Sequence, residues 1–132
     1  MIIDVTCALI VNERGLVLVA QRSSSMSLPL KWEFPGGKVE PDETPENCLI
    51  REISEELNII IQVRHSLPYN VHNYPSISIK LIPFICKFVK GKIKLKEHAN
   101  FKWVGKAELL DLDWADADIP IVNYYLNHTN AI

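Results

Sequence analysis

The stretch that decides the fold is Arg51-Glu52-Ile53-Ser54-Glu55-Glu56, a glutamate-rich run near the middle of the chain. If the stretch is helical, Glu52, Glu55 and Glu56 stand at positions i, i+3 and i+4 and project from one face. Their like charges repel, so a cation is expected among them. Oxygen ligands clustered without Cys or His partners favour Mg²⁺ or Mn²⁺. The alternative is an ordinary solvated acidic face.

The residues around this stretch predict a helix that borders a core. Thr44 is a favourable N-cap residue, and Pro45 fits the first helical position. Asn58 tolerates the left-handed conformation that often follows a helix. An apolar residue recurs every four positions along one face, at Leu49, Ile53 and Leu57. The chain then enters the apolar run 59–61, so the unit is interpreted as loop, helix and strand.

The remaining pattern predicts a mixed sheet. Apolar and β-branched runs predict strands at residues 5–11, 16–22, 59–69, 77–89, 93–95 and 101–104, with turns at 12–15 and 90–92. Pro83 interrupts one of these runs and predicts an edge strand or a bulge. Helices are expected at residues 45–57, 107–110 and 118–126. Strands interrupted by two main helices indicate an α/β fold whose mixed sheet carries a helix on each face.

Gly37, Glu43 and the run from Arg51 to Glu56 together resemble the Nudix box, the signature of the Nudix hydrolase family. The family usually has Gly where this chain has Asn58, and Asn is the next best residue for a positive φ, so the turn is expected to survive. The resemblance implies the Nudix-type α/β/α sandwich. It covers most of the chain, through segments similar to MutT-like and CTP pyrophosphohydrolase-like members at residues 18–22, 32–40 and 117–120.

The resemblance also implies a divalent metal site, with Mg²⁺ as the expected ion and Mn²⁺ as a substitute. The implied ligands are the three helix carboxylates, a backbone carbonyl and a loop glutamate, namely Glu52, Glu55, Glu56, the carbonyl of Gly37, and Glu97. Glu52 is implied to act as the general base as well. For Glu97, an ordinary exposed loop residue is an equal alternative.

Arg51 is expected to orient these carboxylates through bidentate hydrogen bonds rather than to touch the substrate. Glu43 looks like its structural partner. His98 and the other histidines show no spacing typical of metal ligands, so they are interpreted as surface or core residues.

Four further residues are candidates for binding the substrate. By resemblance to MutT-like enzymes, Arg22 lies near the phosphates or sugar, Phe34 against the base, and Asp118 on the base edge. Phe34 also fits simple core packing, and Asp118 also fits a helix N-cap. Lys38 either neutralises a phosphate or lies in solvent.

Base preference rests on fewer residues. An ionised aspartate only accepts hydrogen bonds, which suits the exocyclic amine of cytosine. MutT has Asn where this chain has Asp118, and Arg where it has Ile77. A strict preference for an oxidised guanine nucleotide is therefore not implied.

The composition describes one small domain. With 132 residues and 48% hydrophobic side chains, residues 1–132 are expected to share a single core. The net charge of −2 argues against a nucleic-acid polymer as substrate. Three cysteines without CxxC spacing are expected to be buried free thiols in a reducing compartment, at Cys7, Cys48 and Cys86. No signal peptide or membrane-spanning run of ~20 apolar residues is apparent, so a cytoplasmic location away from membranes is expected.

The resemblance, together with the residue patterns, implies a Mg²⁺-dependent pyrophosphohydrolase of the MutT-like type that converts a nucleoside triphosphate to the monophosphate and pyrophosphate. The candidate substrates are CTP or dCTP derivatives and oxidised nucleotides such as 8-oxo-dGTP, in nucleotide-pool sanitation. One alternative is hydrolysis of a nucleoside diphosphate linked to another group, such as ADP-ribose. Another is a noncatalytic nucleotide-binding regulatory domain. The expected partner is a free nucleotide, and the protein is either a monomer or a homodimer.

Overall fold

A single mixed sheet organises the chain, and the computed structural model describes residues 1–128. Residues 129–132 of the expected 1–132 domain lie outside the described part. The strands are β1 (Ile2–Val11), β2 (Val17–Gln21), β3 (Trp32–Glu33), β4 (Gly36–Lys38), β5 (Ile60–Ser66), β6 (Asn70–Asn73), β7 (Ser78–Lys90) and β8 (Asn100–Val104).

The central pair of strands is parallel and all other pairs are antiparallel. β1 and β7 run side by side from Ile2 opposite Ser78 to Val11 opposite Lys87. The order across the sheet is β3-β2-β1-β7-β5, with β4 also paired to β1, β6 to β7 and β8 to β2. This arrangement confirms the predicted mixed sheet.

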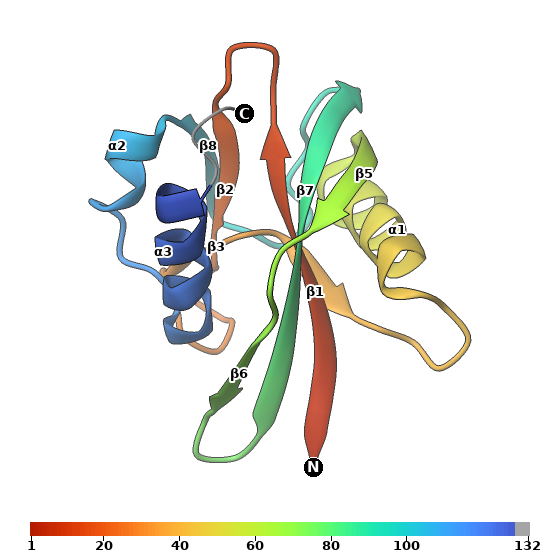
Figure 1. Cartoon of the computed structure of the whole chain (residues 1–132), viewed down its shortest axis with the longest axis vertical. Helices are drawn as coiled ribbons and strands as arrows, with labels where there is room; N and C mark the ends of the chain where they lie inside the picture. Colours follow the sequence, from red (N-terminus) through yellow and green to blue (C-terminus); the bar gives the residue numbers. More distant parts are fainter. Residues whose placement is uncertain (129–132) are drawn as a thin grey trace.

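Helices cover both faces of the sheet, as Figure 1 shows. The helix α1 (Pro45–Leu57) lies on one side, and α2 (Lys106–Leu109) and α3 (Ile119–His128) lie on the other. Successive residues of a strand point to opposite faces, so β1 needs apolar residues in an unbroken run to fill both cores. Cys7 and Leu9 pack on the α3 side, while Ala8 and Ile10 pack on the α1 side. The predicted α/β/α sandwich is confirmed.

The predicted strand at 59–69 ends earlier in the structure, and a further strand that was not predicted follows it. β5 ends at Ser66, and β6 begins at Asn70 on the same side of β7. The intervening segment contains Pro68, which has no N–H for a ladder. Strands β3 and β4 were not predicted, because segments of only two or three residues carry no periodic signal.

Pro83 does not mark an edge strand, because β7 is paired on both sides. Of the two predicted alternatives, an edge strand or a bulge, the edge was wrong, whereas the register of β5 against β7 does shift between Val63 and His65. The Pro83 carbonyl accepts a hydrogen bond from the Leu67 N–H at 3.0 Å, so this side of Pro83 faces the break between β5 and β6. The N–H and C=O of one strand residue point to the same side. The missing N–H of proline therefore falls where the ladder is already interrupted.

The predicted strand at 93–95 is irregular in the structure. Its backbone pairs with a helix end instead of a strand, because the last carbonyls of a helix have no partner within the helix. The Lys94 N–H donates to Leu57 O at 3.0 Å, and the Lys96 N–H donates to Glu56 O at 3.2 Å. This segment is therefore fastened to the C-terminal end of α1.

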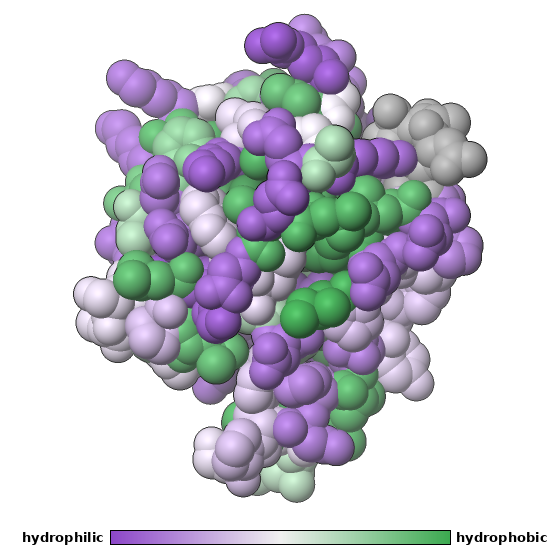
Figure 2. Space-filling model, turned by 90° about the vertical axis from the view of Figure 1, so that its left-hand side faces the viewer, coloured by the Kyte–Doolittle hydropathy of each residue, from purple (hydrophilic) through white to green (hydrophobic). Residues whose placement is uncertain are grey.

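The surface over α2 and α3 mixes hydrophobic and hydrophilic side chains (Figure 2). Leu110 and Ile119, which come from this region, are among the exposed apolar residues. Within residues 1–128, none of the helices has the length and apolar character needed to cross a membrane.

Candidate active site

Helix α1 is fixed at both ends, which sets the direction of its acidic face. The Thr44 hydroxyl accepts a hydrogen bond from the Asn47 N–H at 3.1 Å, so the predicted N-cap is confirmed. Asn58 adopts φ 62° and ψ 32°, and its N–H donates to Ser54 O at 3.0 Å. The predicted apolar stripe is completely buried, at Leu49, Ile53 and Leu57. The glutamates are therefore held at the rim of the core.

Arg51 contacts carboxylates on two sides, as predicted. Its guanidinium binds Glu43 in a bidentate manner, with N–O distances of 2.6 and 3.0 Å. Its Nη1 donates to Glu52 and to Glu55, at 3.0 Å each. The Arg51 hydrogen bonds hold the pKa of Glu43 at about 2. Arg51 thus fixes the loop before α1 and two of the helix carboxylates.

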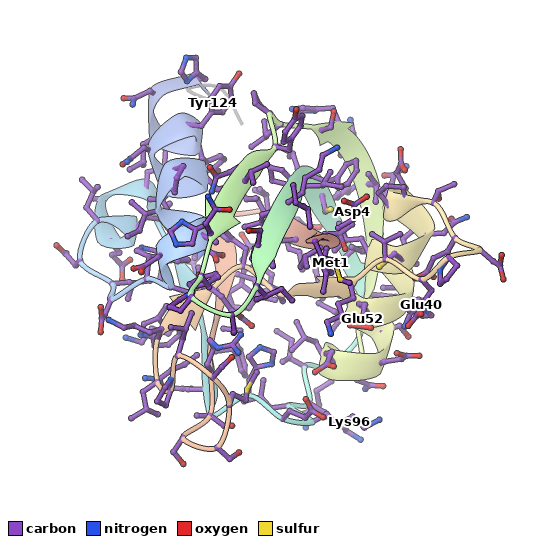
Figure 3. The ribbon with its side chains drawn as sticks, turned by 90° about the horizontal axis from the view of Figure 1, so that it is seen from below. Met1, Asp4, Glu40, Glu52, Lys96 and Tyr124 are labelled. Carbon is purple, nitrogen blue, oxygen red and sulfur yellow. The ribbon has the colours of Figure 1, made fainter. Side chains whose placement is uncertain are left out.

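Glu52 lies directly against Gly37. A Cβ atom on Gly37 would overlap the Glu52 carboxylate, so only glycine leaves room for it. Burial raises the pKa of Glu52, while the contact with Arg51 opposes that rise. In Figure 3, Glu52 projects from α1 toward the middle of the molecule, whereas Glu40 lies in the outer loop.

The carbonyl oxygen of Gly37 points into the sheet. It accepts a hydrogen bond from the Thr6 hydroxyl at 3.3 Å, and Thr6 is its partner residue in β1. Alternate residues of an antiparallel strand face opposite edges, so the Gly36 carbonyl faces the free edge of β4. The Lys38 carbonyl also faces this edge, where it accepts from Cys48 Sγ at 3.2 Å. Gly37 leaves space for the Glu52 side chain. The assignment of the Gly37 carbonyl as a metal ligand remains a prediction.

Glu56 and Glu97 are brought to the same cavity from different elements. Both line it, Glu56 from α1 and Glu97 from the segment fastened to the end of that helix. Burial raises the pKa of Glu56, and the charge of Glu97 raises it further. Glu55 is more exposed than Glu52 and is held by Arg51.

The chemistry of these residues fits a hard divalent cation. All the clustered donors are carboxylate or carbonyl oxygens. Burial, and then the charge of neighbouring carboxylates, disfavours the charged forms of Glu52 and Glu56. Among residues 1–128, however, no three His, Cys, Asp or Glu side chains converge closely enough to enclose an ion. Binding of a cation would therefore require small movements of these long side chains.

The cavity beside this acidic face has a volume of about 430 Å³. Its walls include apolar side chains from β1, β7 and the turn before β7, among them Val5, Ile77 and Leu81. All four predicted substrate residues line the same cavity, namely Arg22, Phe34, Lys38 and Asp118. Residues that lie far apart in sequence thus share one apolar pocket that opens beside carboxylates.

Asp118 is a buried carboxyl group in this cavity. Only 6% of its surface is exposed, and one oxygen accepts a hydrogen bond from the Phe34 N–H at 2.9 Å. Burial raises its pKa well above the usual range, and the charge of Glu33 adds to the effect. A short 3₁₀ turn, Asp116–Asp118, leads into α3. The bond to Phe34 shows that Asp118 joins two walls of the cavity.

Phe34 and Lys38 occupy opposite kinds of environment. The Phe34 ring is buried and tilts against Trp114, with centroids 4.7 Å apart and an interplanar angle of 37°. This contact confirms the core-packing interpretation, although the residue also lines the cavity. Lys38 is exposed beside the cavity.

Arg22 belongs to a hydrogen-bonded chain that the sequence did not reveal. Its Nη1 contacts one Glu33 oxygen at 2.6 Å, and its other nitrogens bind the backbone carbonyl and hydroxyl of Ser27. The second Glu33 oxygen contacts His98 Nε2 at 2.8 Å. Glu33 and His98 were not predicted as site residues. The only available signal was their position beside Phe34 and Glu97.

The NUDIX domain model matches residues 1–125. The chain belongs to the Nudix family. It is 33% identical over 119 residues to a CTP pyrophosphohydrolase of Escherichia coli, covering 90% of this chain and 88% of that protein. It is also 33% identical over 95 residues to an 8-oxo-dGTP diphosphatase of Proteus vulgaris, covering 72% and 85%. The crystal structure of a MutT protein from Methanosarcina mazei superposes with a TM-score of 0.89 at 26% identity, covering 98% and 96%.

Membership confirms the predicted family and the sandwich fold. Nudix hydrolases generally use divalent metal ions. In this Nudix chain, the acidic face of α1 is the region whose chemistry fits such an ion.

Proposed function

We propose that this chain is a MutT-like, Mg²⁺-dependent nucleoside triphosphate pyrophosphohydrolase, which releases the nucleoside monophosphate and pyrophosphate. The observation that carries the proposal is the shared cavity. An apolar pocket with a buried carboxyl group, Asp118, opens beside the acidic face of α1. A base fits the first part and a polyphosphate with its cation fits the second. The names of the two relatives agree with this chemistry.

We assign the cation to the carboxylates of Glu52, Glu55, Glu56 and Glu97 and to a backbone carbonyl of the Gly36-Gly37 pair. When bound, Mg²⁺ would neutralise phosphate charge and lower the pKa of an attacking water. Glu52 is the proposed general base, because burial raises its pKa and a more basic carboxylate abstracts a proton more readily. Arg51 positions Glu52 through their 3.0 Å contact. Lys38 and Arg22 are proposed to face the phosphates or sugar.

Asp118 is the proposed reader of the base. A carboxyl group with a raised pKa keeps its proton to a higher pH, and the protonated form donates as well as accepts. One Asp118 oxygen is already used by the Phe34 N–H, so the other is left for the base. Both the exocyclic amine of cytosine and the edge of a modified purine would fit such a group.

We further propose that the protein acts as one domain on free nucleotides in the cytoplasm. The structure agrees with the predicted state of the cysteines, since all three are free and buried. Unpaired thiols are typical of reducing compartments.

The test is pyrophosphate release from CTP, dCTP, 5-methyl-dCTP, dGTP, 8-oxo-dGTP and ADP-ribose with Mg²⁺. A Glu52→Gln variant, which keeps the shape of the side chain, serves as control. We expect turnover of a triphosphate and a fall of about 10²-fold or more in the control, with its fold intact. Turnover of ADP-ribose alone would indicate a different Nudix activity. Binding without turnover would indicate the regulatory alternative.

A further inference from the structure

The position of Glu97 depends on residues that flank it. Glu97 is exposed and irregular in backbone, and its carboxylate makes no hydrogen bond to another residue of the described chain. On its N-terminal side, the Lys96 N–H is fastened to Glu56 O at 3.2 Å. On its C-terminal side, the Ala99 N–H donates to Gln21 O at 2.9 Å in β2. The segment therefore bridges from the acidic helix to the sheet.

The side chain of His98 supplies a third anchor on this bridge. Its side chain is only 4% exposed, and Nε2 lies 2.8 Å from the Glu33 carboxylate. The other nitrogen, Nδ1, is buried and has no hydrogen-bond partner in residues 1–128. Within the described structure, the polar contact of the imidazole ring is therefore the one to Glu33. In this contact Nε2 donates to the carboxylate, so the proton is on Nε2.

Glu33 is a firm point of attachment. Its strand, β3, pairs with β2 at Ala20, and the preceding Trp32 exchanges backbone hydrogen bonds with Asp113 and Ala115 at 2.8 and 2.9 Å. The second carboxylate oxygen of Glu33 is held by Arg22 at 2.6 Å. A carboxylate fixed by its own strand and by an arginine can hold the imidazole in one orientation.

We propose that His98 is a positioning residue, whose hydrogen bond to Glu33 holds the neighbouring Glu97 carboxylate toward Glu56. The inference rests on the proposed function, in which Glu97 is a metal ligand. Outer hydrogen bonds of this kind orient the groups that bind a metal, and their loss costs about 10- to 100-fold in metal affinity or activity. His98 itself contacts neither metal nor substrate in this role.

The test compares His98→Asn with His98→Gln. The amide nitrogen of Gln reaches about as far as Nε2, whereas that of Asn takes the place of Nδ1. If the Glu33 bond is what matters, Gln keeps it and Asn loses it. Mn²⁺ binding to the nucleotide-free protein, measured by electron paramagnetic resonance, gives a readout separate from turnover. Circular dichroism confirms that each variant is folded.

We expect His98→Asn to weaken Mn²⁺ binding about tenfold and His98→Gln to stay within about threefold of the unchanged protein. We also expect Glu97→Gln to weaken binding, and His98→Asn to add little in the Glu97→Gln background, because both changes remove the same contribution. Equal Mn²⁺ binding by the Asn and Gln variants would overturn the proposal. Independent, additive losses in the double variant would overturn it as well.

Failure of this inference is distinct from failure of the proposed function. Triphosphate turnover that depends on Glu52 would stand even if the Asn and Gln variants behaved alike. If Glu97→Gln leaves Mn²⁺ binding unchanged, Glu97 is not a metal ligand. The proposed positioning role of His98 is then wrong as well. If no nucleotide is turned over, the proposed function itself is wrong.

Discussion

The adjacent residues Gly36 and Gly37 each leave room for a different neighbouring group. A Cβ on Gly37 would meet the end of the Glu52 side chain, whereas a Cβ on Gly36 would meet the backbone carbonyl of Thr6 in β1. A carboxylate can rotate away, but a central strand cannot shift without disturbing its neighbours. The same substitution at the two positions should therefore damage different properties.

We predict that Gly37→Ala lowers kcat about 10²-fold with a small effect on stability, because Glu52 is displaced from the site. Gly36→Ala should lower the free energy of unfolding by about 2 kcal/mol or more, because it overpacks the backbone. Thermal melting and steady-state kinetics on both variants measure the contrast. Equal loss of stability in the two would contradict the role given to Gly37.

Two substitutions of the buried residue Asp118 should also differ in their effects. Asp118→Asn keeps an oxygen for the Phe34 N–H, so we expect the ratio of kcat/KM among bases to change while stability changes little. Asp118→Ala removes the acceptor and should cost about 1–3 kcal/mol of stability, since the Phe34 N–H is left unpaired. Kinetics with CTP and dGTP, together with urea unfolding, test both. Unchanged base ratios in Asp118→Asn would show that the residue only joins two walls.

At the scale of elements, the loop before α1 depends on an ion pair between Glu43 and Arg51. The pKa of Glu43 falls from 4.5 to about 2 in the folded protein. A lowered carboxylate pKa contributes stability that is complete above the unfolded value and is lost as the pH falls through the folded value. The stability difference between the unchanged protein and a Glu43→Gln variant should therefore decrease as the pH falls from about 4.5 to about 2.

We predict that Glu43→Gln is less stable than the unchanged protein at pH 7, and that the difference in urea midpoint narrows at pH 3. Asp42→Asn is the matched control, because Asp42 lies exposed in the same loop and Arg51 pairs with other carboxylates. A difference that stays constant from pH 7 to pH 3 would contradict the assignment.

The C-terminal cap of α1 explains a departure from the family pattern. Asn58 takes the left-handed conformation in place of the usual glycine, and its side chain also donates to Lys92 O at 3.2 Å. We predict that Asn58→Gly changes the free energy of unfolding by less than about 0.5 kcal/mol, while Asn58→Ala lowers it by about 1 kcal/mol. Denaturant unfolding of both variants checks this order, and a more stable Ala variant would refute it.

At the scale of the whole molecule, the sequence predicted the features that depend on local pattern. The capped helix α1, the long strands and the Glu43–Arg51 pair all follow from periodicity or from the spacing of a motif. The sequence did not predict the Glu33–His98 contact, which joins residues 65 positions apart. The prediction of a strand at residues 93–95 was wrong. In sequence, an extended segment that bonds to the end of a helix cannot be told from one that pairs with a strand.

All three thiols are buried, which is testable on the intact protein. Burial raises the pKa of Cys7 and Cys48, and that of Cys86 to about 12. A thiol reacts as its thiolate, so we predict slow labelling of the native protein by a thiol reagent at pH 8 and rapid labelling in denaturant. Rapid reaction of the native protein would show that the cores open readily.

The parallel pairing of β1 with β7 also constrains how the chain reaches its folded state. The first strand pairs with residues 78–87, so it remains without its main partner until about two-thirds of the chain has been synthesised. Contacts between such distant segments slow folding, because a large loop must close before any contact is gained. During translation, the apolar side chains of β1 would stay exposed on the ribosome until β7 emerges. The centre of the sheet thus cannot be completed before β7 is synthesised, and β8 and α3 are added after it.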